Sequence, residues 1–190
     1  MQKLQHGFQR IIKHIPKDSK VLDVGGGGLD GENTTNFLRE RFEDTNITLI
    51  DIAPGRIDAY LEKFAVNEVF RVMEGDFYKV NWEEKFDLIV LDLNIDNNIK
   101  QDWTSKGLNR IHGLLNPGGI VITYVMITDE YGDADTPKMI GDHMKEFWNS
   151  TPPNVYTIRK KLESYSQIYK VFMITKENVR PDIIWVALQK

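Results

Sequence analysis

The chain has 190 residues, of which 41% are hydrophobic and 27% charged, and its 24 basic and 28 acidic side chains give a net charge of −4. These values are typical of one soluble globular domain, and they argue against a disordered chain and against nonspecific binding of nucleic acid, which needs a basic stripe. The chain contains no cysteine, which excludes disulfides, thiolate metal sites and cysteine nucleophiles. Because there is no apolar run near the ~20 residues of a membrane span and no signal-peptide core, a cytoplasmic protein is expected.

An amphipathic helix is predicted over residues 3–15, and Pro16 ends it. Its apolar residues recur at the spacing of one helix face: Leu4, Phe8, Ile11, Ile12 and Ile15. With the connection that follows, this helix makes up an N-terminal segment over residues 1–18. We expect the helix to pack on the domain rather than to cover a ligand.

The first predicted strand, residues 20–24, leads into four consecutive glycines, Gly25 to Gly28. Glycine weakens a strand, but it suits a tight turn whose backbone approaches a ligand closely. A helix to about Arg41 follows, with Glu32 or Asn33 as its cap, so that backbone N–H groups at its start point toward the ligand. This arrangement predicts a nucleotide-like cofactor.

Two classes of cofactor fit this glycine turn. Gly26, Gly28 and Gly31 match the dinucleotide fingerprint G-x-G-x-x-G. Asp23, however, precedes the glycines at the mouth of the strand, where a carboxylate repels a pyrophosphate and attracts an ammonium or sulfonium cation. Asp23 therefore argues against a nicotinamide dehydrogenase.

Asp23, Gly25 and Gly27 resemble the first motif of the class I S-adenosylmethionine-dependent methyltransferases, an acidic residue followed by glycines at alternate positions. Leu29 departs from this motif, in which a third glycine is usual. The resemblance implies a Rossmann-like fold with S-adenosylmethionine as its cofactor. It also implies that Asp23, Gly25 and Gly27 bind that cofactor.

The second strand, predicted over residues 46–51, ends at Asp51, which lies ~20 residues beyond the glycines. An acidic side chain at this place accepts hydrogen bonds from both ribose hydroxyls of a nucleoside. The alternative is that Asp51 caps the helix that opens at Pro54. The resemblance implies that Ile52, beside Asp51, also contacts the cofactor.

A third strand is predicted over residues 69–73, just before Asp76 and Phe77. The resemblance implies that Asp76 accepts a hydrogen bond from the adenine amino group and that Phe77 covers the ring. A plain Gly-Asp turn is the alternative. Because ligands bind at the carboxyl ends of parallel strands, Asp23, Asp51 and Asp76 predict one shared site.

The central strand, predicted over residues 86–93, is a nearly continuous apolar run, as expected of a strand buried on both faces. Asp92, at its end, is predicted both as a cofactor-binding residue and as the catalytic residue, which orients the methyl acceptor or acts as its base. The alternative is a buried helix cap. A helix over residues 103–115 and a strand over residues 120–126 follow, and the string LLNPGGIVI between them resembles the family's helix, Pro-Gly-Gly turn and strand.

Residues 127–153 are predicted to form an insertion on the substrate side of the sheet. Asn94, Tyr124 and Tyr131 are the further candidates for contact with the acceptor. Acidic residues of two loops form a rim that would favour a cationic acceptor, or else an ordinary solvated charge run: Asp92, Asp96, Asp129, Asp133 and Asp135. The stretches 167–175 and 182–188 fit a closing antiparallel hairpin, whereas the segment 155–166 receives no assignment.

The sequence thus predicts one α/β domain over residues 1–190: a three-layer, Rossmann-like, doubly wound sheet, mostly parallel, with an antiparallel C-terminal strand. The resemblance implies methyl transfer from S-adenosylmethionine to an oxygen or nitrogen atom of a small molecule, and the acidic rim favours a cationic one. A spermidine synthase-type aminopropyltransferase, disfavoured by the short segment before the first strand, and a noncatalytic S-adenosylmethionine-binding protein are the alternatives. No metal is expected, since Thr128-Asp129-Glu130 replaces the Asp-Asn pair of metal-dependent relatives.

Overall fold

The computed structural model describes residues 6–28, 33–64, 71–94, 108–126, 155–163, 168–177 and 183–190. Its strands are β1 (Val21–Val24), β2 (Ile47–Asp51), β3 (Arg71–Glu74), β4 (Phe86–Asn94), β5 (Leu115–Met126), β6 (Lys170–Lys176) and β7 (Ile183–Gln189). Its helices are α1 (Gly7–Ile12), α2 (Thr34–Arg41), α3 (Pro54–Phe64), α4 (Leu108–Leu114) and α6 (Val155–Glu163), with a 3-10 turn at Asp44–Asn46.

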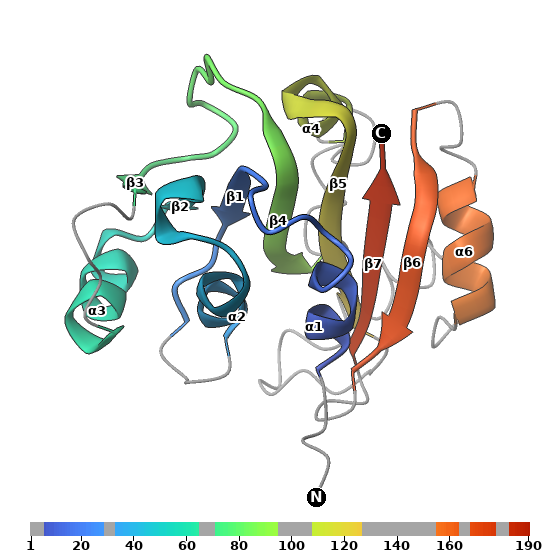
Figure 1. Cartoon of the computed structure of the whole chain (residues 1–190), viewed down its shortest axis with the longest axis horizontal. Helices are drawn as coiled ribbons and strands as arrows, with labels where there is room; N and C mark the ends of the chain where they lie inside the picture. The colour runs from blue at the N-terminus through green and yellow to red at the C-terminus, as the bar shows by residue number, and fades with distance from the viewer. Residues whose placement is uncertain are drawn as a thin grey trace, which may run out of the picture.

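The strands form one seven-stranded sheet in the order β3-β2-β1-β4-β5-β7-β6 (Figure 1). The strands β3, β2, β1, β4 and β5 are parallel, whereas β7 is antiparallel to both of its neighbours, β5 and β6. The chain builds the sheet outward from β1 to β3 and then continues on the other side of β1 with β4. This is the doubly wound, Rossmann-like topology that the sequence predicts, and the reversal beside β1 is where such sheets bind ligands.

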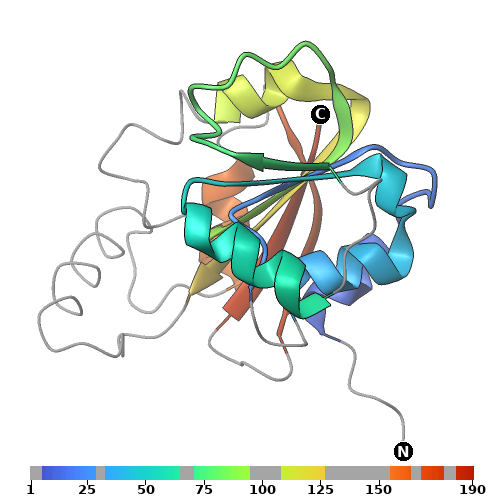
Figure 2. The ribbon, with the colours of Figure 1, turned by 90° about the vertical axis from the view of Figure 1, so that its left-hand side faces the viewer.

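Helices cover both faces of the sheet, which makes three layers (Figure 2). On one face, α1, α2 and α3 bring Phe8, Leu38 and Tyr60 into an apolar cluster with the strands. On the other face, α4 and α6 bring Leu108 and Ile158 into a second cluster. The predicted three-layer domain is therefore confirmed.

Each central strand is buried on both faces, because alternate residues enter the two clusters. In β1, Leu22 packs in the cluster of α4 and α6, and Val21 packs in the cluster of α1 to α3. In β4, Ile89 packs in the cluster of α4 and α6, and Leu88 packs in the cluster of α1 to α3. Successive side chains of a strand point to opposite faces, so a strand between two helical layers needs apolar residues at nearly every position. This requirement explains the apolar run of β4.

The Pro-Gly-Gly sequence lies within β5, not before it as predicted. β5 begins at Leu115, which pairs with Phe86, and the register shifts before Ile120 pairs with Leu88. Gly118 has a φ of 78°, which favours glycine. The Pro-Gly-Gly residues therefore form a bulge within the strand, because pairing with β4 continues on both sides of them.

The remaining elements follow the predicted order. The hairpin of β6 and β7 is confirmed, and the segment that received no assignment contains α6. The predicted helices over residues 3–15 and 103–115 appear as α1 and α4, and parts of both predicted ranges lie outside the described residues. The predicted insertion, residues 127–153, lies outside them as well.

Candidate active site

The glycine loop after β1 is held by a chain of buried contacts. The Thr35 hydroxyl, in the first turn of α2, donates to Oδ2 of Asp23 at 2.7 Å and accepts from the backbone N–H of Gly27 at 2.7 Å. A side chain at Gly26 would overlap the Asp23 carboxylate and the Thr35 hydroxyl. Gly25 and Gly27 have φ values of 74° and 77°, which strain any other residue. Gly25, Gly26 and Gly27 are therefore required by their own surroundings.

The start of α2 completes this loop. Oδ1 of Asn33 accepts from the backbone N–H of Asn36 at 2.8 Å, and its side-chain amide donates to the carbonyl oxygen of Gly28. Asn33 is thus the helix cap, as one of the two predicted alternatives has it. The contact to Gly28 fixes the path of the chain as it leaves the glycine run.

Asp23 lies beneath the glycine loop. Its side chain is fully buried in β1, and its carboxylate points to Thr35. The sequence predicts that this carboxylate faces the cofactor, but it is not among the side chains that line the cavity described next. Through Thr35, Asp23 is linked to the backbone of the loop at Gly27.

A cavity of about 380 Å³ opens at the carboxyl ends of β1, β2 and β3. Small-molecule sites have volumes of about 300 to 1,000 Å³, so the cavity is large enough for a nucleoside. The residues that line it come from the ends of these strands and the turns after them: Val24, Gly25, Ile50, Asp51, Ile52, Ala53, Arg56, Gly75, Asp76, Phe77 and Tyr78. The structure thus brings five of the predicted cofactor-binding residues to one cavity: Gly25, Asp51, Ile52, Asp76 and Phe77.

Asp51 presents a buried carboxylate at this cavity. It is 4% exposed, and its Oδ1 accepts from the backbone N–H of Ala53 at 2.8 Å. Its Oδ2 lies 3.5 Å from Nη1 of Arg56, a largely exposed side chain in the first turn of α3. Asp51 therefore holds the turn before α3 with one oxygen and lies near Arg56 with the other.

Ile52 is the exposed apolar wall of the cavity. Its side chain is 69% exposed, although it is a large aliphatic group directly beside a buried carboxylate. An exposed isoleucine gains free energy when a flat apolar ring covers it. Asp51 and Ile52 together therefore offer one polar and one apolar contact to a ligand at the end of β2.

The turn after β3 carries Asp76 and Phe77. Oδ1 of Asp76 accepts from the backbone N–H of Tyr78 at 2.9 Å, and Oδ2 lies 3.4 Å from the exposed Lys79 ammonium group. Phe77 is nearly fully buried and packs against Trp82. Asp76 is thus a turn residue at the cavity wall, and the Phe77 ring lies mainly in the apolar core beneath it.

The predicted acceptor residues lie farther along the same edge of the sheet. β4 extends to Asn94, so Asp92 and Asn94 are at its carboxyl end, and Asn94 pairs with Tyr124 of β5 in the strand register. The Tyr124 ring packs edge-on against Trp185 of β7, with the ring centroids 5.2 Å apart. Tyr131 lies outside the described residues.

Thr35 and Arg56 are among the residues of the site that were not predicted. Thr35 links Asp23 to Gly27, and Arg56 lines the cavity beside Asp51. A signal for Arg56 was available, because the first turn of a helix that opens at Pro54 must lie near the end of the preceding strand. A threonine in a helix carries no comparable signal.

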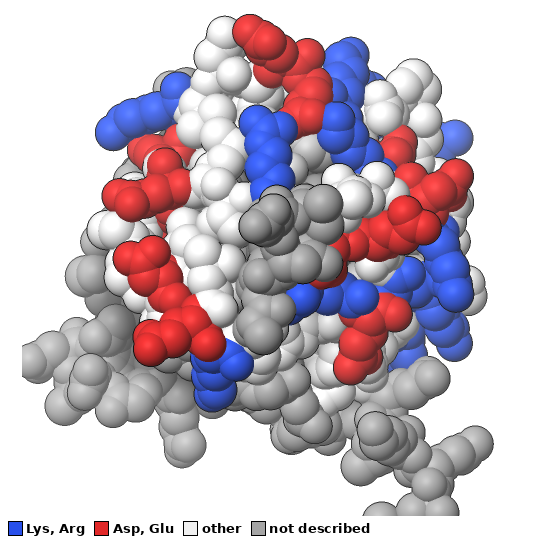
Figure 3. All heavy atoms as spheres, turned by 60° about the vertical axis from the view of Figure 1, so that its left-hand side comes forward, with Lys and Arg blue, Asp and Glu red and all other residues white. Residues whose placement is uncertain are grey.

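The surface on the side of α3 and β3 has no continuous basic stripe over its described part (Figure 3). Exposed charges of both signs come from α3, β3 and the turn after it: Arg56, Asp58, Glu62, Lys63, Arg71, Glu74, Lys79, Glu83 and Lys85. Among the described residues, no group of three or more His, Cys, Asp or Glu side chains is placed to hold a metal ion. In the described chain, no helix is long and apolar enough to cross a membrane.

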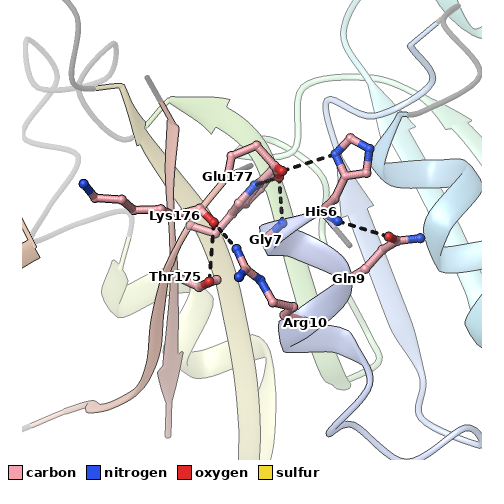
Figure 4. A network of polar contacts seen from close by, with 8 residues as sticks. His6, Gly7, Gln9, Arg10, Thr175, Lys176 and Glu177 are labelled. Atoms are coloured by element: carbon pink, nitrogen blue, oxygen red, sulfur yellow. Dashed lines mark hydrogen bonds and ion pairs between the residues drawn. The ribbon is translucent and has the colours of Figure 1, made fainter. Parts of the chain in front are cut away.

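A second polar cluster, around the residue that follows β6 in the chain, anchors α1 (Figure 4). The buried Glu177 accepts from the backbone N–H of Gly7 at 2.8 Å and from Nε1 of Trp185 at 3.0 Å, and its other oxygen lies 3.4 Å from Nδ1 of His6. A side chain at Gly7 would come within 2.9 Å of the carbonyl oxygen of Lys176. α1 thus packs on the domain, as predicted, and the element that it contacts here is the hairpin of β6 and β7.

The fold and the site define a class of protein. A doubly wound parallel sheet with a glycine loop after β1, a carboxylate at the end of β2 and a second one after β3, all around one cavity, is a Rossmann-like domain for a nucleoside-containing cofactor.

The particular family follows from comparison with known proteins. The methyltransferase domain family matches residues 21–119, from the start of β1 to the end of the Pro-Gly-Gly bulge, and the chain belongs to this family. It is an S-adenosylmethionine-dependent methyltransferase. The predicted enzyme class and cofactor are confirmed.

Solved structures of methyltransferases share the fold. The N-methyltransferase NodS from Bradyrhizobium japonicum WM9, also solved with S-adenosylhomocysteine, is 15% identical, with a TM-score of 0.63 over 96% of this chain and 92% of NodS. The 1,6-didemethyltoxoflavin-N1-methyltransferase from Burkholderia thailandensis, solved with 1,6-didemethyltoxoflavin and S-adenosylhomocysteine, is 18% identical, with a TM-score of 0.65 over 96% of this chain and 76% of that enzyme. The carbon methyltransferase of CurJ is 18% identical, with a TM-score of 0.60 over 94% of this chain and 50% of that structure. At such identities the likeness extends to the fold.

Proposed function

We propose that this chain transfers the methyl group of S-adenosylmethionine to a nitrogen or oxygen atom of a small acceptor, with the adenosine part of the cofactor in the cavity at the ends of β1, β2 and β3. The observation that carries this proposal is the combination of a buried carboxylate, Asp51, an exposed apolar side chain, Ile52, and a side-chain-free glycine loop around one cavity of about 380 Å³. A ribose requires the carboxylate, and an adenine ring requires the apolar side chain. The rest of the cofactor requires a backbone that it can approach closely.

Asp51 is the proposed partner of the ribose hydroxyls. The hydrogen bond from Ala53 holds Oδ1 of its carboxylate, and Asp51 lines the cavity, so Oδ2 is the proposed acceptor for the hydroxyls. The 3.5 Å contact of Oδ2 with the exposed Arg56 is at the long limit of a hydrogen bond, and a hydroxyl donor replaces it at small cost.

Ile52, Asp76 and Phe77 are the proposed adenine contacts. Covering an isoleucine side chain that is 69% exposed contributes roughly 1 to 2 kcal/mol to binding. The Oδ2 atom of Asp76 is the proposed acceptor for the adenine amino group, since Oδ1 is held by Tyr78. Phe77 forms the floor beneath this contact.

Gly25 and Gly27 carry the proposed backbone contacts to the rest of the cofactor, and Asp23 acts through them. Asp23 and Thr35 hold the N–H of Gly27, which fixes the loop before a ligand binds. A carboxylate at this place, if ionised, favours a cationic cofactor over a pyrophosphate. Asp23 is therefore a positioning residue in this proposal.

The cofactor supplies an electrophilic methyl group on a sulfonium, so the protein has mainly to align the acceptor and exclude water. Asp92 is the proposed residue that orients or deprotonates the acceptor, because it lies at the end of β4, next to β1 and its glycine loop. Asn94, Tyr124 and Tyr131 are the proposed further acceptor contacts. A carboxylate in this role favours an amine, and two of the similar structures named above are N-methyltransferases.

The test of the cofactor site is thermal unfolding with S-adenosylmethionine, S-adenosylhomocysteine, decarboxylated S-adenosylmethionine and NAD. A ligand at ~100 times its dissociation constant adds about 2.7 kcal/mol of stability, which raises Tm by roughly 5 to 10 °C in a domain of this size. We expect stabilisation by the first two compounds. A preference for the decarboxylated compound would instead favour aminopropyl transfer, and a response to NAD alone would contradict the proposal.

The test of the acceptor is methyl transfer from isotopically labelled S-adenosylmethionine to a panel of small amines and small hydroxyl compounds. We expect labelled product from amines. Tight binding of S-adenosylmethionine without transfer to any member of the panel, or to protein and RNA added as further acceptors, would favour a noncatalytic binding protein.

A further inference from the structure

Arg110 of α4 holds the turn that carries Asp76 and Phe77, although it does not line the cavity itself. Its Nη2 donates to the carbonyl oxygen of Val80 at 2.6 Å and to that of Phe77 at 3.3 Å. Its guanidinium carbon lies 5.8 Å from the centroid of the Phe77 ring. Figure 2 shows α4 beside the segment that joins β3 to β4. Arg110 therefore contacts both the backbone and the ring of Phe77.

The contacts of this turn divide between its two ends. The backbone N–H groups of Lys79 and Val80 donate to the carbonyl oxygen of Asp76 at 2.8 and 3.2 Å, and that of Tyr78 donates to the Asp76 carboxylate. The carbonyl oxygens of Phe77 and Val80 instead accept from the Arg110 guanidinium group on α4. A hydrogen bond with a charged donor is stronger than one between neutral groups.

The carbonyl oxygens and the aromatic ring of this turn compensate the positive charge of Arg110. The side chain is half-buried, and its Nε is buried without a hydrogen-bond partner among the described residues. No carboxylate of the described residues forms an ion pair with it, whereas Arg39 of α2 pairs with Asp44. A guanidinium group in such a place relies on carbonyl oxygens and an aromatic ring. Its position and that of the turn therefore fix each other.

We infer that Arg110 is a positioning residue for adenine recognition: it holds the turn of Phe77 and Val80, and so sets the Asp76 carboxylate against the adenine amino group. The inference rests on the proposed function, in which Asp76 touches the adenine. A hydrogen bond weakens steeply when its distance and angle depart from the optimum. The preference for a purine with a 6-amino group then depends on a residue that never touches the cofactor.

The test compares two ligands by isothermal titration calorimetry: S-adenosylhomocysteine, and the same compound with hydrogen in place of the adenine amino group. The wild type should prefer the first by about tenfold or more, as expected for one hydrogen bond to a carboxylate. In Arg110→Met, S-adenosylhomocysteine should bind about tenfold more weakly, whereas the analogue changes by less than about twofold, so that the preference disappears.

Arg41→Met is the matched control. Arg41, at the end of α2, also donates to backbone carbonyl oxygens, those of Ile12, Lys13 and Ile15, but this segment does not line the cavity. We expect Arg41→Met to lower stability and to keep the ligand preference. If Arg110→Met behaves as this control does, Arg110 is a structural residue and the inference is overturned.

Two further variants separate the possible failures. Arg110→Lys keeps the charge but loses the planar guanidinium group, so it should retain only part of the preference for the 6-amino group. If Arg110→Met does not fold, this variant decides: a preference equal to that of the wild type in Arg110→Lys overturns the inference. If Asp76→Ala keeps the preference, the proposed role of Asp76 fails together with the inference. If Asp76→Ala removes the preference and Arg110→Met keeps it, the proposed function stands and the inference alone fails.

Discussion

The Thr35 hydroxyl is the central contact of the glycine loop, and valine removes it with little change of side-chain shape. The hydroxyl donates to Asp23 and accepts from the N–H of Gly27, each at 2.7 Å, and all three residues are buried. Thr35→Val therefore deprives a buried amide of its acceptor and a buried carboxylate of one donor. It leaves the apolar contacts of α2 in place.

The magnitude follows from these two contacts. A buried polar group that loses its partner costs about 1 to 3 kcal/mol, and a charged group costs more. We therefore expect the free energy of unfolding to fall by about 3 to 5 kcal/mol, and Tm to fall by about 6 °C or more in a domain of this size. S-adenosylhomocysteine should bind at least about tenfold more weakly, because the loop N–H groups are no longer held in place.

Urea unfolding followed by circular dichroism gives the first quantity, and calorimetric titration gives the second. Thr48→Val is the control, since Thr48 is also buried but lies in β2, outside the contacts of the loop. This variant should change stability by less than about 1 kcal/mol. If Thr35→Val loses no more stability than Thr48→Val and binds S-adenosylhomocysteine as the wild type does, the reasoning about this hydroxyl is refuted.

Three further predictions concern Asp51, Asp92 and Glu84. Asp51→Ala should weaken the binding of S-adenosylhomocysteine by about 10- to 100-fold in calorimetric titration; an unchanged affinity would remove Asp51 from the site. Asp92→Asn should slow methyl transfer while the affinity for S-adenosylhomocysteine stays within about twofold; an equal loss of both would assign Asp92 to structure or to the cofactor. Burial raises the pKa of Glu84, but its contacts with Lys20 and Arg71 outweigh burial and hold that pKa below its usual value of 4.5. A lowered pKa contributes stability above the usual value, and this stability is lost as the pH falls through the folded-state value. Glu84→Gln should therefore have a lower Tm than the wild type at pH 7, and the difference should shrink as the pH falls below about 4; a difference that does not depend on pH would contradict this balance.

The central strands could be predicted because they are buried on both faces. Such strands leave long apolar runs, and β4 is the clearest of them. The start of β5 could not be predicted in the same way. Pro117, Gly118 and Gly119 signal a turn by local rules, but the pairing of Leu115 with Phe86 continues the strand before them. A contact between residues far apart in the chain overrides the local signal here.

The same distinction applies to the site. Gly25, Asp51 and Asp76 were predictable as site residues, because each follows a strand and all parallel strands end at one edge. Thr35 and Arg110 were not, because their roles depend on partners that only the folded chain brings near. Arg110 lies in α4, whereas the carbonyl oxygens that it contacts belong to the turn after β3. No local pattern marks such a residue.

In the structure, the two alternatives predicted for Asp51 and for Asp76 are compatible with each other. The sequence presents ligand binding by Asp51 and the capping of α3 as alternatives, and likewise ligand binding by Asp76 and a plain turn. Each carboxylate has two oxygens, and in both residues one oxygen accepts a backbone N–H while the other stays directed elsewhere. The turn contact fixes the plane of the carboxylate before a ligand arrives, which lowers the entropy that binding must overcome. The structural role of these residues is therefore a condition of the proposed binding role.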